Sequence, residues 1–222
     1  MVGAVGRPRE ERIDHDALDA VRELLSEVGY AALTLESVAH RASTTKPALR
    51  RRWPSRKHLV VDALIEQVRD AEVPDTGCTH CDLVECVEAF RHVLDEPAYG
   101  PTLRTLLVEL HDEPALRARL LEYFFTPRQD VAKIAFERGM ERGHIRRDVR
   151  VDVLLDMLAS VITHRVILGH RTIGPGLSEE VVSTVLRGVG TDEWVIHHAP
   201  SLAAVTPSSD AYDAEYAKLW QH

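Results

Sequence analysis

Apolar residues in the first part of the chain recur at intervals of three and four, which is the period of one helix face. Seven of them follow this spacing between positions 13 and 28: Ile13, Ala17, Ala20, Val21, Leu24, Leu25 and Val28. Gly29 comes next and suits the end of a helix, because glycine tolerates left-handed backbone. The pattern predicts a first helix of about four turns.

Two short helices and one long helix are predicted next from their capping residues. Thr34 is a candidate N-cap for a short helix, and Thr45 is a candidate N-cap for another, with Pro47 tolerated in its first turn. Ser55 then caps a long helix that is expected to reach about Glu72. The two short helices are separated by a three-residue turn, which is the arrangement of a helix-turn-helix.

The rest of the chain also has a helical pattern, and the alternation typical of strands is nearly absent. The expected helices cover roughly 82–96, 101–112, 114–143 with a break near Thr126-Pro127, 151–171 and 178–189. Residues 199–210 resemble a loop and residues 211–220 a short helix. Four aromatic residues in the last thirty or so residues suggest that this tail packs against the protein: Trp194, Tyr212, Tyr216 and Trp220.

Charge is distributed unevenly along a chain whose formal net charge is −8. Residues 1–58 carry eleven Lys+Arg against eight Asp+Glu, whereas residues 59–222 carry sixteen against twenty-seven. Between residues 37 and 61 there are seven Lys+Arg and no carboxylate, and most of them fall in the stretch TTKPALRRRWPSRK. A basic segment on an acidic body indicates a polyanionic partner, although charge alone fits a solvated surface equally well.

Composition sets the broad class of protein. At 222 residues, 45% of them hydrophobic, the chain can bury a core without disulfides, metal or cofactor. The apolar runs are too short or too interrupted for a signal peptide or a membrane span. Three cysteines without an export signal fit a reducing compartment. We therefore expect a cytoplasmic protein with no membrane contact.

Several motifs together resemble the TetR family of bacterial transcriptional regulators. They are GRPR near the start, EVGYAALTLESVAHRA before the turn, KPAL after it, and RWPSRK at the end of the basic segment. The resemblance is strong over about residues 6–66 and weaker to about 190, through ERGHIRRDVRVDVLLDMLASVITHRV. It implies an all-α fold of about nine helices, with an N-terminal three-helix DNA-binding domain that contains a helix-turn-helix and a C-terminal helical ligand-binding and dimerisation domain.

The expected organisation follows from this resemblance. Residues 1–58 form the DNA-binding domain, with the helix-turn-helix at about 34–53, and residues 59–190 form the ligand-binding and dimerisation domain. The tail, 191–222, lies outside the resemblance. The chain departs from the family at Ser43, where glycine is usual, and at Arg50, where an aromatic residue is usual. Ser43 must either avoid positive φ or accept strain, and Arg50 offers a phosphate or base contact.

A helix-turn-helix places the N-terminal residues of its second helix against base edges in the major groove. Thr44, Thr45, Lys46 and Pro47 hold those positions, and the arginines that follow flank the phosphates. The resemblance adds backbone contacts near Thr34 and a minor-groove role for the N-terminal arm. The predicted DNA-binding residues are Arg7, Arg9, Thr34, Thr44, Thr45, Lys46, Pro47, Arg50, Arg51, Arg52 and Lys57.

A single module of this kind contacts little DNA, so we expect a homodimer on a palindromic double-stranded operator, with recognition helices ~34–36 Å apart. If each subunit neutralises about four phosphates, the log–log salt slope should be on the order of −7. The dimer seam is predicted in 151–171 and 178–189, whose apolar residues could instead form an intrachain core.

A small-molecule inducer, hydrophobic or aromatic, is expected to bind between the central helices. The candidate lining residues, for which core packing is the alternative, are Leu103, Leu106, Leu107, Leu110, Phe124, Phe125, Phe136, Met140, Met157, Val161 and His164.

Other chemistry has weaker support in the sequence. Cys78, Cys81 and Cys86 lie close together near His80 and leave open a metal site or a thiol switch. Phosphate loops, zinc-protease motifs and nucleophile elbows are absent from the sequence, so no catalytic residue is assigned and we do not expect an enzyme. The sequence-based hypotheses are a ligand-released repressor, a helical carrier that has lost operator binding, and a thiol or metal sensor.

Overall fold

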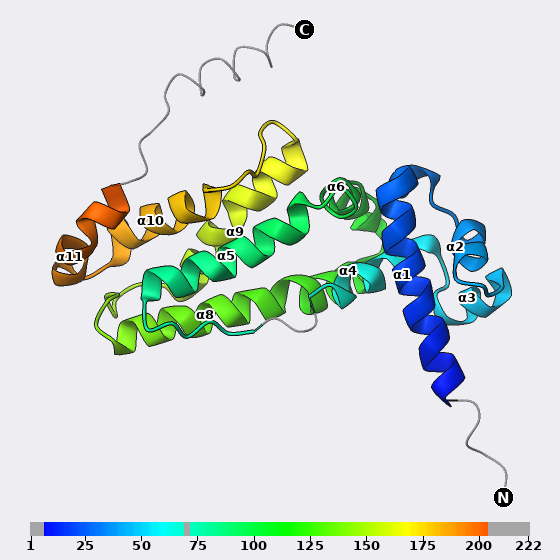
Figure 1. The fold of residues 1–222 in the computed structure, drawn as a ribbon, viewed down its shortest axis with the longest axis horizontal. Helices are drawn as coiled ribbons and strands as arrows, with labels where there is room; N and C mark the ends of the chain where they lie inside the picture. The colour runs from blue at the N-terminus through cyan, green and yellow to red at the C-terminus, as the bar shows by residue number, and fades with distance from the viewer. Residues whose placement is uncertain (1–6, 69–71, 204–222) are drawn as a thin grey trace, which may run out of the picture. The chain divides into compact units, whose positions relative to one another are not determined.

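The computed structural model describes residues 7–68 and 72–203, and the side chains of 12–68 and 72–198 (Figure 1). The described part is all-helical, which confirms the expected fold class. Its only β-type pairing is an isolated antiparallel bridge between Ile145 and Gly190. None of the described helices is long and apolar enough to cross a membrane.

The described residues form eleven α-helices. They are α1 (Arg7–Ala32), α2 (Leu35–Arg41), α3 (Lys46–Arg52), α4 (Arg56–Glu66), α5 (Thr79–Asp95), α6 (Gly100–Glu109), α7 (Pro114–Leu120), α8 (Thr126–Glu141), α9 (Val151–Leu168), α10 (Leu177–Val189) and α11 (Asp192–Ala203). A 3₁₀ turn, Leu110–Asp112, follows α6, and a π-helical turn, Leu121–Phe125, joins α7 to α8. The described part has more helices than expected because 114–143 divides and the start of the tail is helical.

Two compact units make up the described part of the chain. The first contains residues 7–68 and 92–129, and the second contains residues 72–91 and 130–203. The first unit therefore includes α6 and α7 as well as α1 to α4. These units are defined by packing, whereas the predicted boundary after residue 58 concerns function, so that boundary stays a prediction.

In the first unit, α1 packs against α2, α4 and α6 (Figure 1). Helix α4 also packs against α7. Helix α1 begins at Arg7, six residues before the predicted start at Ile13. The prediction missed this part because it is polar and carries no apolar pattern. Gly29 has φ 72°, so the backbone leaves the helical conformation where the sequence predicted an end. Helix α4 ends at Glu66 and is shorter than the predicted helix, which was expected to reach about Glu72.

The predicted break near Thr126-Pro127 is a π-helical turn that immediately precedes α8. Pro127 has no N–H and therefore cannot donate a helical hydrogen bond to the carbonyl of residue 123. The Thr126 hydroxyl donates instead to the carbonyl of Leu121, at 3.2 Å. The widened turn accommodates the proline and lets the helical path continue into α8.

In the second unit, α10 packs against both α9 and α11. The inner faces of α9 and α10 contribute buried residues such as Leu158, Ile162 and Val182. Helix α11 extends to Ala203, so the loop predicted for 199–210 is wrong in its first five residues. Trp194 is only 5% exposed, which confirms that it packs. The other three aromatic residues of the tail, Tyr212, Tyr216 and Trp220, lie outside the described residues.

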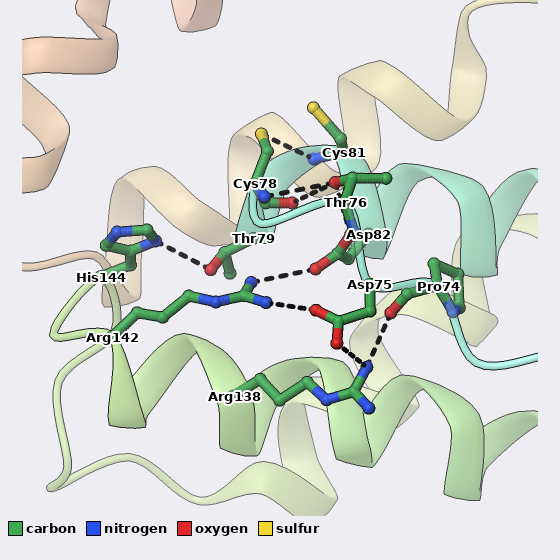
Figure 2. Close-up of polar contacts among 10 residues, drawn as sticks. All are labelled: Pro74, Asp75, Thr76, Cys78, Thr79, Cys81, Asp82, Arg138, Arg142 and His144. Carbon is green, nitrogen blue, oxygen red and sulfur yellow. Dashed lines mark hydrogen bonds and ion pairs between the residues drawn. The ribbon is translucent and has the colours of Figure 1, made fainter.

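A polar network fixes the segment before α5 to the end of α8 (Figure 2). Asp82, fully buried, accepts hydrogen bonds from the N–H and hydroxyl of Thr76, and Arg142 Nη1 lies 3.0 Å from its second oxygen. Arg142 also binds Asp75 at 2.7 Å, and Arg138 donates to the carbonyl of Pro74. Burial raises the pKa of Asp82, but these hydrogen bonds outweigh it, so the pKa lies below its ordinary value.

Candidate DNA-binding site

Helix α2 begins with a complete capping box, as the position of Thr34 predicted. The Thr34 hydroxyl accepts from the N–H of Ser37 at 3.1 Å, and the Ser37 hydroxyl accepts from the N–H of Thr34 at 3.1 Å. The cap fixes where α2 starts. Leu35, Val38 and Ala39 of this helix are buried, so α2 is anchored to the rest of the first unit through its apolar face.

The turn between α2 and α3 contains Ser43 with φ 49°. Of the two possibilities left open by the sequence, the structure shows the left-handed conformation, which costs a residue with a Cβ about 1–2 kcal/mol. The N–H of Thr44 donates to the carbonyl of Ala39 at 2.9 Å and helps to close the turn. The turn therefore forms with serine in place of glycine.

Two buried residues, Leu49 and Trp53, anchor helix α3 to the core of the first unit. Leu49 is completely buried, and Trp53 Nε1 donates to Asp62 of α4 at 2.9 Å. Thr45 caps the helix as predicted, its hydroxyl accepting from the N–H of Ala48 at 3.3 Å. This anchoring leaves Pro47, next to the N-terminus of α3, on the exposed surface.

Most of the cations in the basic segment are paired with carboxylates that the sequence places outside it. Arg41 binds Glu23 and Glu27 of α1, and the paired arginine lowers the pKa of Glu27. The remaining pairs are Lys46 with Glu36, Arg52 with Asp14, Arg56 with Glu109 and Lys57 with Glu113. The local excess of positive charge is thus smaller in the folded protein than in the sequence.

Two arginines of α3 differ from the others. Arg50 and Arg51 are exposed and form no hydrogen bond or ion pair within the described part of the chain. Arg50 attracts Glu36 only through longer-range electrostatics, which contributes to the lowered pKa of that carboxyl after the larger effect of Lys46. These guanidinium groups are available to phosphates or bases without first breaking a contact.

The structure brings the predicted residues of the turn and of α3 onto neighbouring positions of the first unit. Thr34, Thr45, Pro47, Arg50 and Arg51 are exposed. Lys46, Arg52 and Lys57 are partly buried in their ion pairs. The side chains of the N-terminal arm, Arg7 and Arg9, lie outside the described ones. DNA contacts by this set stay predictions.

Sequence reasoning missed the carboxylates that hold these cations, above all Asp14, Glu36 and Glu113. Arg52 and Asp14 are far apart in the sequence, and so are Lys57 and Glu113. Neither pair has the spacing of three or four residues that would reveal a contact on one helix. Glu36 lies in the first turn of a helix that the sequence predicts. Its distance from Lys46, however, depends on the conformation of the turn between α2 and α3, which the sequence does not show.

The predicted ligand-lining residues divide between the two units. In the first unit, Leu103, Leu106, Leu110 and Phe124 are completely buried, and Leu107 and Phe125 are partly buried. In the second unit, Phe136 is completely buried and Met140 partly buried, whereas Met157 and His164 are exposed on α9.

Val161 and His164 line an open hollow of about 360 Å³. Its other lining residues are Ser160, Arg165, His170 and Arg171. The His164 and His170 rings meet edge to face, with centroids 4.8 Å apart. The hollow brings two of the predicted ligand residues together on the second unit, and the ligand role of the whole set stays a prediction.

The cysteines near the start of α5 are free thiols. The N–H of Cys81 donates to the sulfur of Cys78 at 3.3 Å (Figure 2). A hydrogen bond with Cys78, together with burial, raises the pKa of the Cys81 thiol to about 11. Burial raises the pKa of the Cys86 thiol to about 12. Thiols with such values are protonated at neutral pH and react slowly. The described residues contain no cluster of three side chains suited to a metal ion.

A capped pair of short helices joined by a tight turn, with exposed arginines on the second, defines a helix-turn-helix DNA-binding protein. Two domain families match the chain: "Bacterial regulatory proteins, tetR family" over residues 17–63 and "Tetracyclin repressor-like, C-terminal domain" over residues 73–185. The chain belongs to the TetR family of transcriptional regulators, which is not a family of enzymes.

Similar proteins include other bacterial regulators. An HTH-type transcriptional regulator of Mycobacterium tuberculosis is 34% identical over 152 residues, which cover 63% of this chain and 74% of the relative. The regulator YdeS of Bacillus subtilis is 26% identical over 185 residues, which cover 83% of this chain and 93% of YdeS. The crystal structure of another TetR family transcription regulator has 31% identity and a TM-score of 0.67, covering 80% of this chain and 98% of that one.

Proposed function

We propose that this TetR-family chain is a repressor that binds a palindromic DNA operator as a homodimer and releases it when a small hydrophobic or aromatic molecule binds. The observation that carries the proposal is the geometry of α3. Leu49 anchors the helix in the core, while Arg50 and Arg51 extend from it with no partner in the described part of the chain. These exposed, unpaired guanidinium groups in the last turn of α3 suit the DNA phosphates, while Thr45, Lys46 and Pro47 at its N-terminus lie where base edges would be contacted.

The dimer is supported by the outer face of α9. Four large apolar side chains on this helix remain exposed in the single subunit: Val153 at 44%, Met157 at 46%, Ile167 at 38% and Leu168 at 60%. Their spacing places them along one side of the helix, and burying such a stripe against a second copy would remove apolar area from water. The proposed seam is this exposed stripe, because the apolar residues of α10 other than the partly buried Val189 are already buried within the subunit.

The inducer is proposed from the apolar character of the predicted lining. Leu103, Leu106 and Phe124 supply buried apolar surface within the first unit. Regulators of this family bind ligands as well as DNA and act as dimers. Ligand binding would favour a distance between the two DNA-binding domains of the dimer that no longer matches the ~34 Å between half-sites. A cytoplasmic location, where the chromosome lies, is part of this proposal.

Selection of bound fragments from the source genome tests the function. We expect enrichment of a palindromic sequence, bound by two subunits as measured by light scattering, with affinity that falls steeply as salt rises. Compounds that shift the thermal unfolding temperature are then tested for release of the selected fragment. Absence of any enriched fragment would refute the regulator and favour a helical carrier.

A further inference from the structure

The N-terminus of α4 is held by acidic residues of the α6–α7 segment, within the first unit. Arg56 Nη2 lies 3.5 Å from Glu109 of α6, and Lys57 forms an ion pair with Glu113, which is the N-cap residue of α7. Both cations come from the basic segment that the sequence assigned to DNA. Only one of them, Lys57, is a predicted phosphate contact.

Arg56 is fixed by several interactions at once. Its guanidinium donates to the carbonyl of Tyr30 at 3.1 Å and lies over the Tyr30 ring, 4.2 Å from its centroid. The Tyr30 hydroxyl in turn donates to Glu109 at 2.6 Å. Moving Arg56 to a phosphate would break this whole set. Its role is therefore to join α1, α4 and α6, which also explains why it is a poor candidate for DNA.

Lys57 has a different environment. Glu113 is its only polar partner among the described residues, and its side chain is 26% exposed. A lysine ammonium on a flexible stem can exchange a carboxylate for a phosphate by rotating a few side-chain bonds. Glu113 is not occupied by its own helix, because its side chain makes no capping hydrogen bond.

The other paired cations of the DNA-binding surface have partners within α1 to α3, the three helices that we call the head. Lys46 binds Glu36 of α2, and Arg52 binds Asp14 of α1. Those carboxylates lie on the same three helices, α1 to α3, as the cations that they bind. Glu113 instead belongs to the segment between α6 and α7, which lies beyond the head in the sequence, so its distance from Lys57 depends on how α7 packs against α4.

We propose that Glu113 restrains DNA binding by competing with an operator phosphate for the ammonium group of Lys57. This inference rests on the proposed function and adds a regulatory residue to it. Free Lys57 adds a positive charge to the DNA-facing surface, and Glu113 both neutralises that charge and repels the phosphate. Because the linkage is reciprocal, a change that draws α7 toward Lys57 weakens DNA binding, and bound DNA weakens the contact between α4 and Glu113.

The test compares two single carboxylate-to-amide variants on the selected operator fragment. Glu113→Gln removes the charge and keeps the shape, and we expect affinity at low salt to rise about three- to tenfold for a dimer. Asp112→Asn is the matched control, because Asp112 is exposed, adjacent, and forms no ion pair within the described residues. It reports the general effect of one less negative charge and should raise affinity by less than about twofold.

A Lys57→Met background separates competition from general electrostatics. Methionine keeps an unbranched stem without the charge, so in this background Glu113→Gln should have no larger effect than Asp112→Asn. The inference is overturned if Glu113→Gln and Asp112→Asn act equally in the wild-type chain, or if the gain persists in Lys57→Met. Circular dichroism and thermal unfolding establish that each variant is folded. Failure of the wild-type chain to bind any fragment would instead overturn the proposed function, and this inference with it.

Discussion

Salt dependence of operator binding measures how many cations of each subunit reach phosphates. Arg50 and Arg51 are ready to do so, which gives two phosphates per subunit and four per dimer. At about 0.9 per phosphate the log–log slope would be about −3.6. If Lys46 and Lys57 also leave their carboxylates, the count doubles and the slope approaches about −7. The wild-type slope therefore reports whether the ion pairs open on DNA.

Arg51→Ala removes one exposed guanidinium from each subunit, and hence two phosphate contacts from the dimer. The slope should become less steep by about 1.8, so that raising salt from about 50 to 200 mM costs about tenfold less affinity than in the wild type. Fluorescence anisotropy of the labelled operator fragment over this range gives both slopes. Arg147→Ala is the control, because Arg147 is an exposed arginine of the second unit and also has no partner in the described residues. An unchanged slope for Arg51→Ala, or an equal change for Arg147→Ala, would refute the assignment of α3 to the phosphates.

Three further variants test the turn, the polar network and the seam. Ser43→Gly should raise the free energy of unfolding by about 0.5–1 kcal/mol, measured by urea denaturation. Glycine removes the strain of a Cβ at φ 49°, and this gain exceeds the entropy that glycine adds to the unfolded chain. A loss of stability would contradict this. Asp82→Asn should lower it by about 2–4 kcal/mol near pH 7. Because the folded pKa of Asp82 is lowered, its contribution exists above the unfolded value of about 3.9 and is lost as pH falls through the folded value, so the variant should lose less stability on acidification than the wild type. Met157→Glu should weaken the dimer at least about tenfold in sedimentation equilibrium, whereas Ile196→Glu, at an even more exposed apolar residue of α11, should not; equal effects would place the seam elsewhere.

Local signals were sufficient for the helix-turn-helix. Thr34 and Thr45 each cap a helix through a residue three positions ahead, so the interaction that starts the helix lies within the motif that predicts it. Pro127 similarly predicted the irregular turn before α8, because proline has no N–H group to donate. The first turn of α1 was missed because it carries no apolar spacing, and the end of α11 was missed because Pro200 and Ser201 are typical of loops.

The electrostatic state of the basic segment was not predictable in the same way. Its sequence shows seven cations and no carboxylate, yet Asp14 and Glu113 reach it from positions well before and well after it. These pairings depend on how α1 and α7 pack, and packing follows from many apolar contacts at once. The sequence therefore located the surface but overstated its free charge.

The pairing of cations changes what the surface is suited to do. A head with seven unpaired cations would bind any duplex strongly, because the phosphate backbone carries no sequence information. Holding Lys46, Arg52 and Lys57 against carboxylates lowers this non-specific attraction, while Arg50 and Arg51 stay unpaired within the described part of the chain. A correct operator can repay the cost of opening the pairs through base contacts, and an incorrect duplex cannot. On this argument the acidic partners of the head contribute to specificity, and replacing Glu36 or Glu113 by glutamine should raise affinity for random DNA by a larger factor than affinity for the operator.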